Sequence, residues 1–110
     1  MISPSEFYYY KAEILRVIDG DTVDLEIDLG LNVFSVQRCR LYGIDAPERK
    51  AGKEATDYLK HQVLMDGPNC ICQTYKDKQG KYGRWLVTIY FGEMNMNEML
   101  VKKGLAKEYK

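Results

Sequence analysis

One stretch of the chain alternates strictly between apolar and polar side chains. Every second residue from Val23 to Leu29 is branched and apolar, and the residues between them are aspartate or glutamate after Thr22. This period of two predicts a half-buried strand over residues 22–29. The segment from Tyr8 to Ile18 is rich in aromatic and branched residues and ends in an Asp-Gly turn. We therefore expect the two segments to form a hairpin.

Turn residues and one helical stripe delimit the other elements. Gly30 and Asn32 mark a turn into a third strand, and Gly67-Pro68 ends a segment whose apolar residues repeat every three or four positions. Asn97 is expected to cap a final short helix. The predicted elements are strands at 8–18, 22–29, 33–41, 69–76 and 85–91 and helices at 52–65 and 97–103.

The order of these elements, three strands, a helix, two strands and a helix, predicts an α+β fold. Five short strands, three of them in a meander, fit a closed five-stranded β-barrel of the OB type with packed helices. The 110 residues are expected to form one domain spanning 1–110. No run of 18 apolar residues and no basic, apolar leader is present, so we expect neither a membrane span nor a signal peptide.

The cysteine and charge patterns bear on the cellular compartment and on the kind of ligand. Cys39, Cys70 and Cys72 are odd in number, which favours reduced thiols in a core and a cytoplasmic protein. With one histidine in the chain, a zinc site is disfavoured. The net charge is zero, but residues 1–28 carry seven acids against two bases, so the remainder is basic. This asymmetry suits a metal beside a polyanion, and solvated loops explain it equally well.

Two aspartates are placed to share a cation. Asp21 and Asp45 both follow turns at strand ends, and a closed barrel can bring these ends side by side. Adjacent carboxylates repel unless a cation lies between them, and oxygen ligands, with the carbonyl of Ala46 as one more, favour Ca²⁺ or Mg²⁺ over zinc. The alternative is that each aspartate only stabilises its own turn.

A glutamate and two arginines complete the parts needed to hydrolyse a phosphodiester. Glu48 follows a proline that fixes the backbone ahead of it, and it could act as a general base on water. Arg40 and Arg84 could stabilise a phosphoryl transition state through their planar donors. Arg38 lies on the same strand face as Arg40 and competes for that role. All of these side chains could instead be ordinary surface charges.

The turn after the fourth strand adds weaker candidates. Lys81 and Tyr82 could hold a neighbouring phosphate, although such a pair in a turn is weak support by itself. His61 falls within the predicted helix without a catalytic partner nearby, and we expect it on the helix surface or at the edge of the core.

Several motifs, in order, resemble the staphylococcal nuclease (thermonuclease) family, and the likeness extends from about Ala12 to Lys107. They are Val17-Ile18-Asp19-Gly20-Asp21-Thr22-Val23, Arg40-Leu41-Tyr42-Gly43-Ile44-Asp45-Ala46-Pro47-Glu48, Lys81-Tyr82-Gly83-Arg84 and the run from Asn97 to Lys107. The resemblance implies an OB-fold, Ca²⁺-dependent nuclease that cleaves DNA and RNA to 3′-phosphate products.

Position by position, the resemblance implies roles for eight residues. Calcium would be held by Asp21, Asp45 and the Ala46 carbonyl, with Glu48 as base. Arg40 and Arg84 would contact the scissile phosphate, and Lys81 and Tyr82 the next one.

The chain departs from the founding enzyme in a longer segment between Thr22 and Arg40, which implies an extended hairpin, and in a shorter loop after Glu48. We expect a monomeric nuclease acting on DNA, RNA or both. The rival hypothesis is an inactive OB module that binds nucleic acid or protein, since its many tyrosines could stack single strands. Such a module would not need both aspartates, Glu48 and both arginines.

Overall fold

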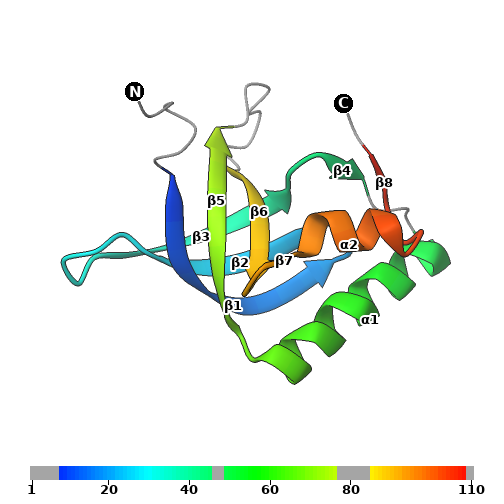
Figure 1. Cartoon of the computed structure of the whole chain (residues 1–110), viewed down its shortest axis with the longest axis horizontal. Coiled ribbons are helices and arrows are strands. Elements are labelled where there is room, and N and C mark those ends of the chain that lie inside the picture. Colours follow the sequence, from blue (N-terminus) through cyan, green and yellow to red (C-terminus); the bar gives the residue numbers. More distant parts are fainter. Residues whose placement is uncertain (1–7, 46–48, 77–84, 109–110) are drawn as a thin grey trace.

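A closed barrel of five strands forms the centre of this computed structural model, which describes residues 8–45, 49–76 and 85–108 (Figure 1). The strands follow the order β3-β2-β1-β5-β6, and β3 also pairs with β6, which closes the barrel. The expected α+β fold with an OB-type barrel is therefore confirmed. The barrel strands are β1 (Tyr9–Asp19), β2 (Thr22–Asp28), β3 (Phe34–Leu41), β5 (Asn69–Lys76) and β6 (Trp85–Phe91).

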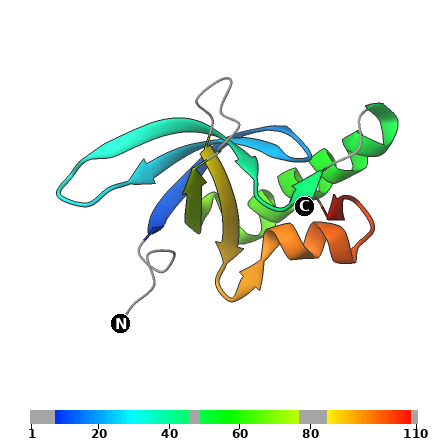
Figure 2. The same cartoon turned by 90° about the horizontal axis from the view of Figure 1, so that it is seen from above.

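The remaining elements lie at the ends of these strands. Helix α1 (Arg49–Asp66) follows the short strand β4 (Ile44–Asp45), and α2 (Met96–Lys102) follows β7 (Met94–Asn95). The pairing of β8 (Lys107–Glu108) with β4 forms a second, two-stranded sheet. Both helices lie on the same side of the barrel, opposite the projecting β2–β3 hairpin (Figure 2). None of the helices in the described part of the chain is long and apolar enough to cross a membrane.

The alternation along β2 sorts its side chains as predicted. Val23, Leu25 and Ile27 are buried in the barrel, whereas the acidic residues between them are only partly covered. The three cysteines belong to the same core: Cys39 lies on the inner face of β3, and Cys70 and Cys72 lie on that of β5. All three are free and buried, as expected of reduced thiols in a core.

The β2–β3 hairpin extends beyond the barrel (Figure 2). Its turn uses Leu31 and Asn32 at positive φ angles of 56° and 61°, which are unusual for residues with a side chain. Leu31 at the tip is 99% exposed. The long segment between Thr22 and Arg40 therefore forms the extended hairpin that was expected.

Two helix boundaries differ from the expectation. Helix α1 begins at Arg49, three residues before the expected start at Gly52, which is buried within the first turn. The cap of α2 is Asn95, whose side chain accepts a hydrogen bond from the Glu98 amide at 3.1 Å. The prediction that Asn97 caps this helix is wrong, because Asn97 lies inside the helix and is buried.

Candidate active site

The hairpin turn between β1 and β2 places Asp21 beside the end of β3. The backbone amide of Leu41 donates to the Asp21 carbonyl at 2.7 Å, which ties the turn to that strand. In the β2–β3 register Thr22 lies opposite Arg40. The Asp21 carboxylate consequently lies 3.9 Å from Nε of Arg40, and both side chains are partly buried.

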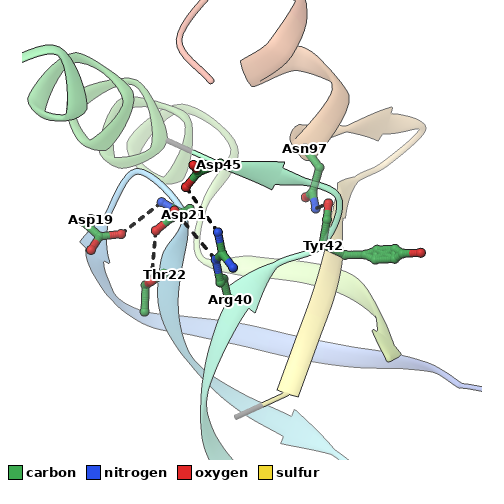
Figure 3. A network of polar contacts seen from close by, with 7 residues as sticks. All are labelled: Asp19, Asp21, Thr22, Arg40, Tyr42, Asp45 and Asn97. Atoms are coloured by element: carbon green, nitrogen blue, oxygen red, sulfur yellow. Dashed lines mark hydrogen bonds and ion pairs between the residues drawn. The ribbon is translucent and has the colours of Figure 1, made fainter. Parts of the chain in front are cut away.

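A second turn brings Asp45 to the same guanidinium. Gly43 adopts a φ angle of +76°, a conformation that L-residues with a side chain rarely adopt, and the chain reverses there from β3 into β4. The pairing of Asp45 with Lys107 in β8 anchors the short strand. Nη2 of Arg40 then donates to Oδ1 of Asp45 at 3.2 Å, so that Arg40 bridges the two carboxylates (Figure 3).

Asp19 supports the position of Asp21 from within the turn. Its Oδ1 accepts a hydrogen bond from the Asp21 amide at 3.1 Å, and the Thr22 hydroxyl donates to Oδ1 of Asp21 at the same distance (Figure 3). Burial favours the neutral form of Asp19, but hydrogen bonds from Asp21 and Thr22 outweigh it and keep its pKa below the ordinary value. The turn therefore remains anionic at neutral pH.

Arg38, the competing arginine, has a partner of its own. Its Nε and Nη2 donate to the two carboxylate oxygens of Asp24 at 2.8 and 3.2 Å. These hydrogen bonds are the largest cause of the lowered pKa of Asp24. Two positions along β3 therefore separate an arginine held in a surface ion pair from one that bridges the carboxylates at the strand end. The geometry favours Arg40 over Arg38.

Asn97 fixes the backbone next to this cluster, a role that the sequence analysis missed. Its amide nitrogen donates to the carbonyls of Tyr42 and Val87 at 2.9 and 3.0 Å, and its amide oxygen accepts from the Ile89 amide at 3.2 Å. Tyr42 points away from Arg40, as Figure 3 shows, and its ring packs on Tyr75 with the centroids 4.0 Å apart. No local signal marks Asn97 for this task, because its partners come from distant segments.

The described part of the cluster supplies two oxygen ligands of the kind that a hard cation takes. Two carboxylates from separate elements converge on one positive group, and their donor atoms are all oxygen. Among the described residues, no group of three histidine, cysteine, aspartate or glutamate side chains could hold a metal ion. The other predicted site residues lie outside the described residues: Ala46, Glu48, Lys81, Tyr82 and Arg84. His61 is on the helix surface, as expected.

Comparisons with known proteins point to one family. Residues 38–110 match the family described as staphylococcal nuclease homologue. The chain is 35% identical over 105 residues to a thermonuclease of Staphylococcus hyicus, covering 86% of this chain and 57% of that protein. It is 34% identical over 99 residues to an uncharacterized endonuclease of Escherichia coli O157:H7, covering 87% and 59%.

A third relative is much larger than this chain. The chain is 32% identical over 120 residues to Endonuclease YhcR of Bacillus subtilis, covering 96% of this chain and 9% of that protein. It also spans little more than half the length of the first two relatives.

Proposed function

Since the chain belongs to the staphylococcal nuclease family, we propose that it is a Ca²⁺-dependent nuclease that hydrolyses DNA, RNA or both to 3′-phosphate products. The observation that carries this proposal is the bridge from Arg40 to Asp21 and Asp45, which gathers three of the expected site residues from separate segments. The names of the relatives, a thermonuclease and endonucleases, support the same reaction class.

Asp21, Asp45 and the carbonyl of Ala46 would hold the calcium ion. When bound, the ion supplies positive charge that polarises the phosphate and helps position the attacking water. Oxygen donors of this kind suit Ca²⁺. The low pKa of Asp19 keeps a further negative charge within the same turn, which favours a cation there.

Glu48 would act as the general base. Its carboxylate takes a proton from water while the water oxygen forms a bond to phosphorus on the side opposite the 5′-oxygen. The bond from phosphorus to the 5′-oxygen then breaks, and that oxygen leaves with a proton from solvent. The phosphate remains on the 3′-oxygen of the other fragment, which accounts for the proposed products.

Arg40 and Arg84 would stabilise the charge that develops on the phosphoryl oxygens. A guanidinium offers two parallel donors, which match two oxygens of a phosphate better than a single ammonium group does. The contacts of Arg40 with both carboxylates, which hold its side chain in one direction, support this role. Lys81 and Tyr82 would bind the adjacent phosphate.

A cleavage assay tests the proposal. Plasmid DNA, single-stranded DNA and RNA are incubated with the protein in Ca²⁺, in Mg²⁺ and in excess chelator, and the ends of the products are analysed. We expect cleavage in Ca²⁺, none in chelator, and 3′-phosphate ends. Undiminished cleavage in chelator contradicts the metal assignment, and binding without cleavage under every condition favours the inactive OB module instead.

A further inference from the structure

A cavity of about 530 Å³ opens at the end of the barrel from which the β2–β3 hairpin projects. Side chains on a strand alternate between its two faces, so positions two residues apart share a face. Tyr10 lies two residues before buried Ala12, Thr74 lies two after buried Cys72, and Trp85 lies two before buried Val87. The cavity therefore continues the inner face of the barrel beyond its packed core.

The cavity exists because the barrel is closed over only part of its length. β3 pairs with β6 from Cys39 to Leu41, whereas β2 and β3 remain paired with each other as far as Asp28 and Phe34. Within the described residues, the part of β3 before Cys39 therefore has a ladder partner on one side only. Ser35 and Gln37, on this part of β3, line the cavity.

The lining has the chemistry of a site for a flat, uncharged, hydrogen-bonding ring. Tyr8, Tyr10 and Trp85 provide aromatic surfaces, and no charged side chain is among the described lining residues. Nε2 of Gln37 donates to the Ser35 hydroxyl at 2.8 Å, which orients the carboxamide in the wall. Pockets of this size with mostly apolar walls and a few convergent polar groups commonly bind small ligands.

A nucleobase meets these requirements, and its phosphates would remain outside. Bases stack on tyrosine and tryptophan rings and form hydrogen bonds with amide and hydroxyl groups along their edges. Among the described lining residues, a free phosphate or an acidic peptide would find no positively charged side chain. A purely aliphatic ligand would leave the carboxamide and hydroxyl groups without a partner that replaces water.

The cavity is also within reach of the candidate active site. Gln37 precedes Arg40 by three residues on β3, which is roughly 10 Å along the strand, or about three stacked nucleotides. The two side chains lie on opposite faces of the strand, so a polynucleotide would pass from one to the other around the open part of β3. Bases within a duplex are paired and stacked, and they could enter only after unpairing.

We propose that this cavity binds a base of single-stranded nucleic acid a few nucleotides from the scissile phosphate. The inference rests on the proposed function for the identity of its substrate and names that substrate's class: single strands, or duplex ends that have come apart. The aromatic walls and neutral polar groups of the cavity favour a base as the ligand. Arg40 and its two carboxylates, on the other face of β3, would bind the phosphates of the same strand together with the metal ion.

Trp85 is the single tryptophan of the chain and reports directly on the cavity. Its emission is followed while a short single-stranded oligonucleotide is added in chelator, and the recovered strand is checked for integrity. We expect saturable quenching, and clearly weaker quenching by the same strand annealed to its complement. Absence of quenching by a single strand that binds in a separate anisotropy measurement overturns the proposal.

Two neighbouring tyrosines give a matched pair of variants. Tyr8 and Tyr9 are 48% and 47% exposed, but Tyr8 lines the cavity, whereas the ring of Tyr9 lies 6.3 Å from that of Tyr90. Tyr8→Ala should weaken binding of the single strand by roughly 5-fold or more, the usual effect of losing one stacking ring. Tyr9→Ala should bind as the unchanged protein does. Equal effects of the two substitutions overturn the proposal.

Two further outcomes separate this proposal from its premise. Cleavage without quenching keeps the proposed nuclease activity and overturns the base site. Saturable quenching without cleavage in any metal overturns the activity and supports the base site as that of a binding module. A Trp85 signal that changes with protein concentration alone, together with dimers in sedimentation, shows a second copy in the cavity and overturns the proposal.

Discussion

Arg40 and Arg38 share a face of one strand and differ in what surrounds them. Arg38 is held by Asp24 on the neighbouring strand, whereas Arg40 reaches Asp21 and Asp45 at the strand end. Arg40→Lys keeps the charge but loses the planar pair of donors. We expect kcat to fall by roughly 10²–10³-fold, the scale of one lost transition-state donor. Steady-state kinetics on a short oligonucleotide measures the change.

Arg38→Lys is the matched control for that experiment. It makes the same chemical change on the same strand, at a side chain paired with Asp24. We expect close to normal kcat, with a small effect on stability, because exposed ion pairs contribute little. If Arg38→Lys loses activity and Arg40→Lys does not, the assignment of the two arginines is reversed. Circular dichroism of both variants checks that the barrel is retained.

The three cysteines illustrate how burial sets reactivity. Removal from water raises the pKa of Cys39 and Cys70 to about 12 and that of Cys72 to about 11. Since the thiolate is the reactive form, the folded protein should react very slowly with a thiol reagent at neutral pH, and the unfolded chain should react at all three positions. Rapid modification of the folded protein would contradict this packing.

The same thiols predict a dependence of stability on alkaline pH. The folded state holds these protons more tightly than the unfolded chain, whose thiols have a pKa of about 8.5. The stabilisation is fully present below that pH. It is lost as the pH rises toward the folded values of about 11 and about 12. Denaturant unfolding at a series of pH values should therefore show a free energy of unfolding that falls above pH 9 or so.

At the scale of elements, Asn97 joins α2 to two parts of the barrel. Asn97→Ala would leave the Ile89 amide and the Tyr42 carbonyl without their side-chain partner. Because unsatisfied groups of this kind cost about 1–3 kcal/mol each, we expect a loss of roughly 2–4 kcal/mol in the free energy of unfolding. Urea denaturation measures it.

Asn95→Ala provides the comparison for Asn97, because it removes only the cap of the same helix. Loss of the bond to the Glu98 amide should cost about 1 kcal/mol. The order of the two effects distinguishes the present assignment from the one that the sequence suggested. A larger loss at Asn95 than at Asn97 would mean that the long-range bonds contribute little.

Elements with local sequence signals were predicted from the sequence, and features set by tertiary packing were not. The strands at 69–76 and 85–91 have the predicted bounds, because alternation and turn residues are local signals. The short strands β4, β7 and β8 were not predicted, since two residues show no period. Asn97 was read as a cap because its partners at Tyr42, Val87 and Ile89 are set by tertiary packing.

The candidate site divides in the same way. The sequence analysis proposed Asp21, Arg40 and Asp45 as site residues, and the structure brings these three together, while their roles stay predictions. Arg38 remained an alternative in the sequence analysis. The pairing of β2 with β3 places Arg38 opposite Asp24, where the two form an ion pair, and this pairing cannot be predicted from residue types alone. The roles of Glu48 and Arg84 lie outside the described residues and stay predictions.

For the whole molecule, ligand binding should appear as added thermal stability. A calcium ion with a nucleotide that carries two phosphates would bind the folded state only. At a hundred times Kd this adds about 2.7 kcal/mol, or roughly 10 °C in Tm for a chain of this size. Asp21→Asn should abolish the shift. Asp24→Asn, which removes a carboxylate paired with Arg38, should retain it. An unchanged Tm for the starting protein contradicts the site.

The three-residue pairing between β3 and β6 has a consequence for motion in the folded protein. Local opening is easiest where few contacts join segments distant in sequence, and within the described residues only Cys39, Arg40 and Leu41 of β3 pair with β6 in the ladder. The Tyr42 amide, which donates to the Val87 carbonyl across this pairing, should therefore exchange with deuterium sooner than the amides of the β1–β2 ladder. Arg40 is the middle residue of this pairing. If Arg40 and Arg84 bind one phosphate, as proposed, the ligand would join β3 to the residue that precedes β6 and oppose the opening of the barrel there. Ligand binding would then slow the exchange of the backbone amides that join β3 to β6.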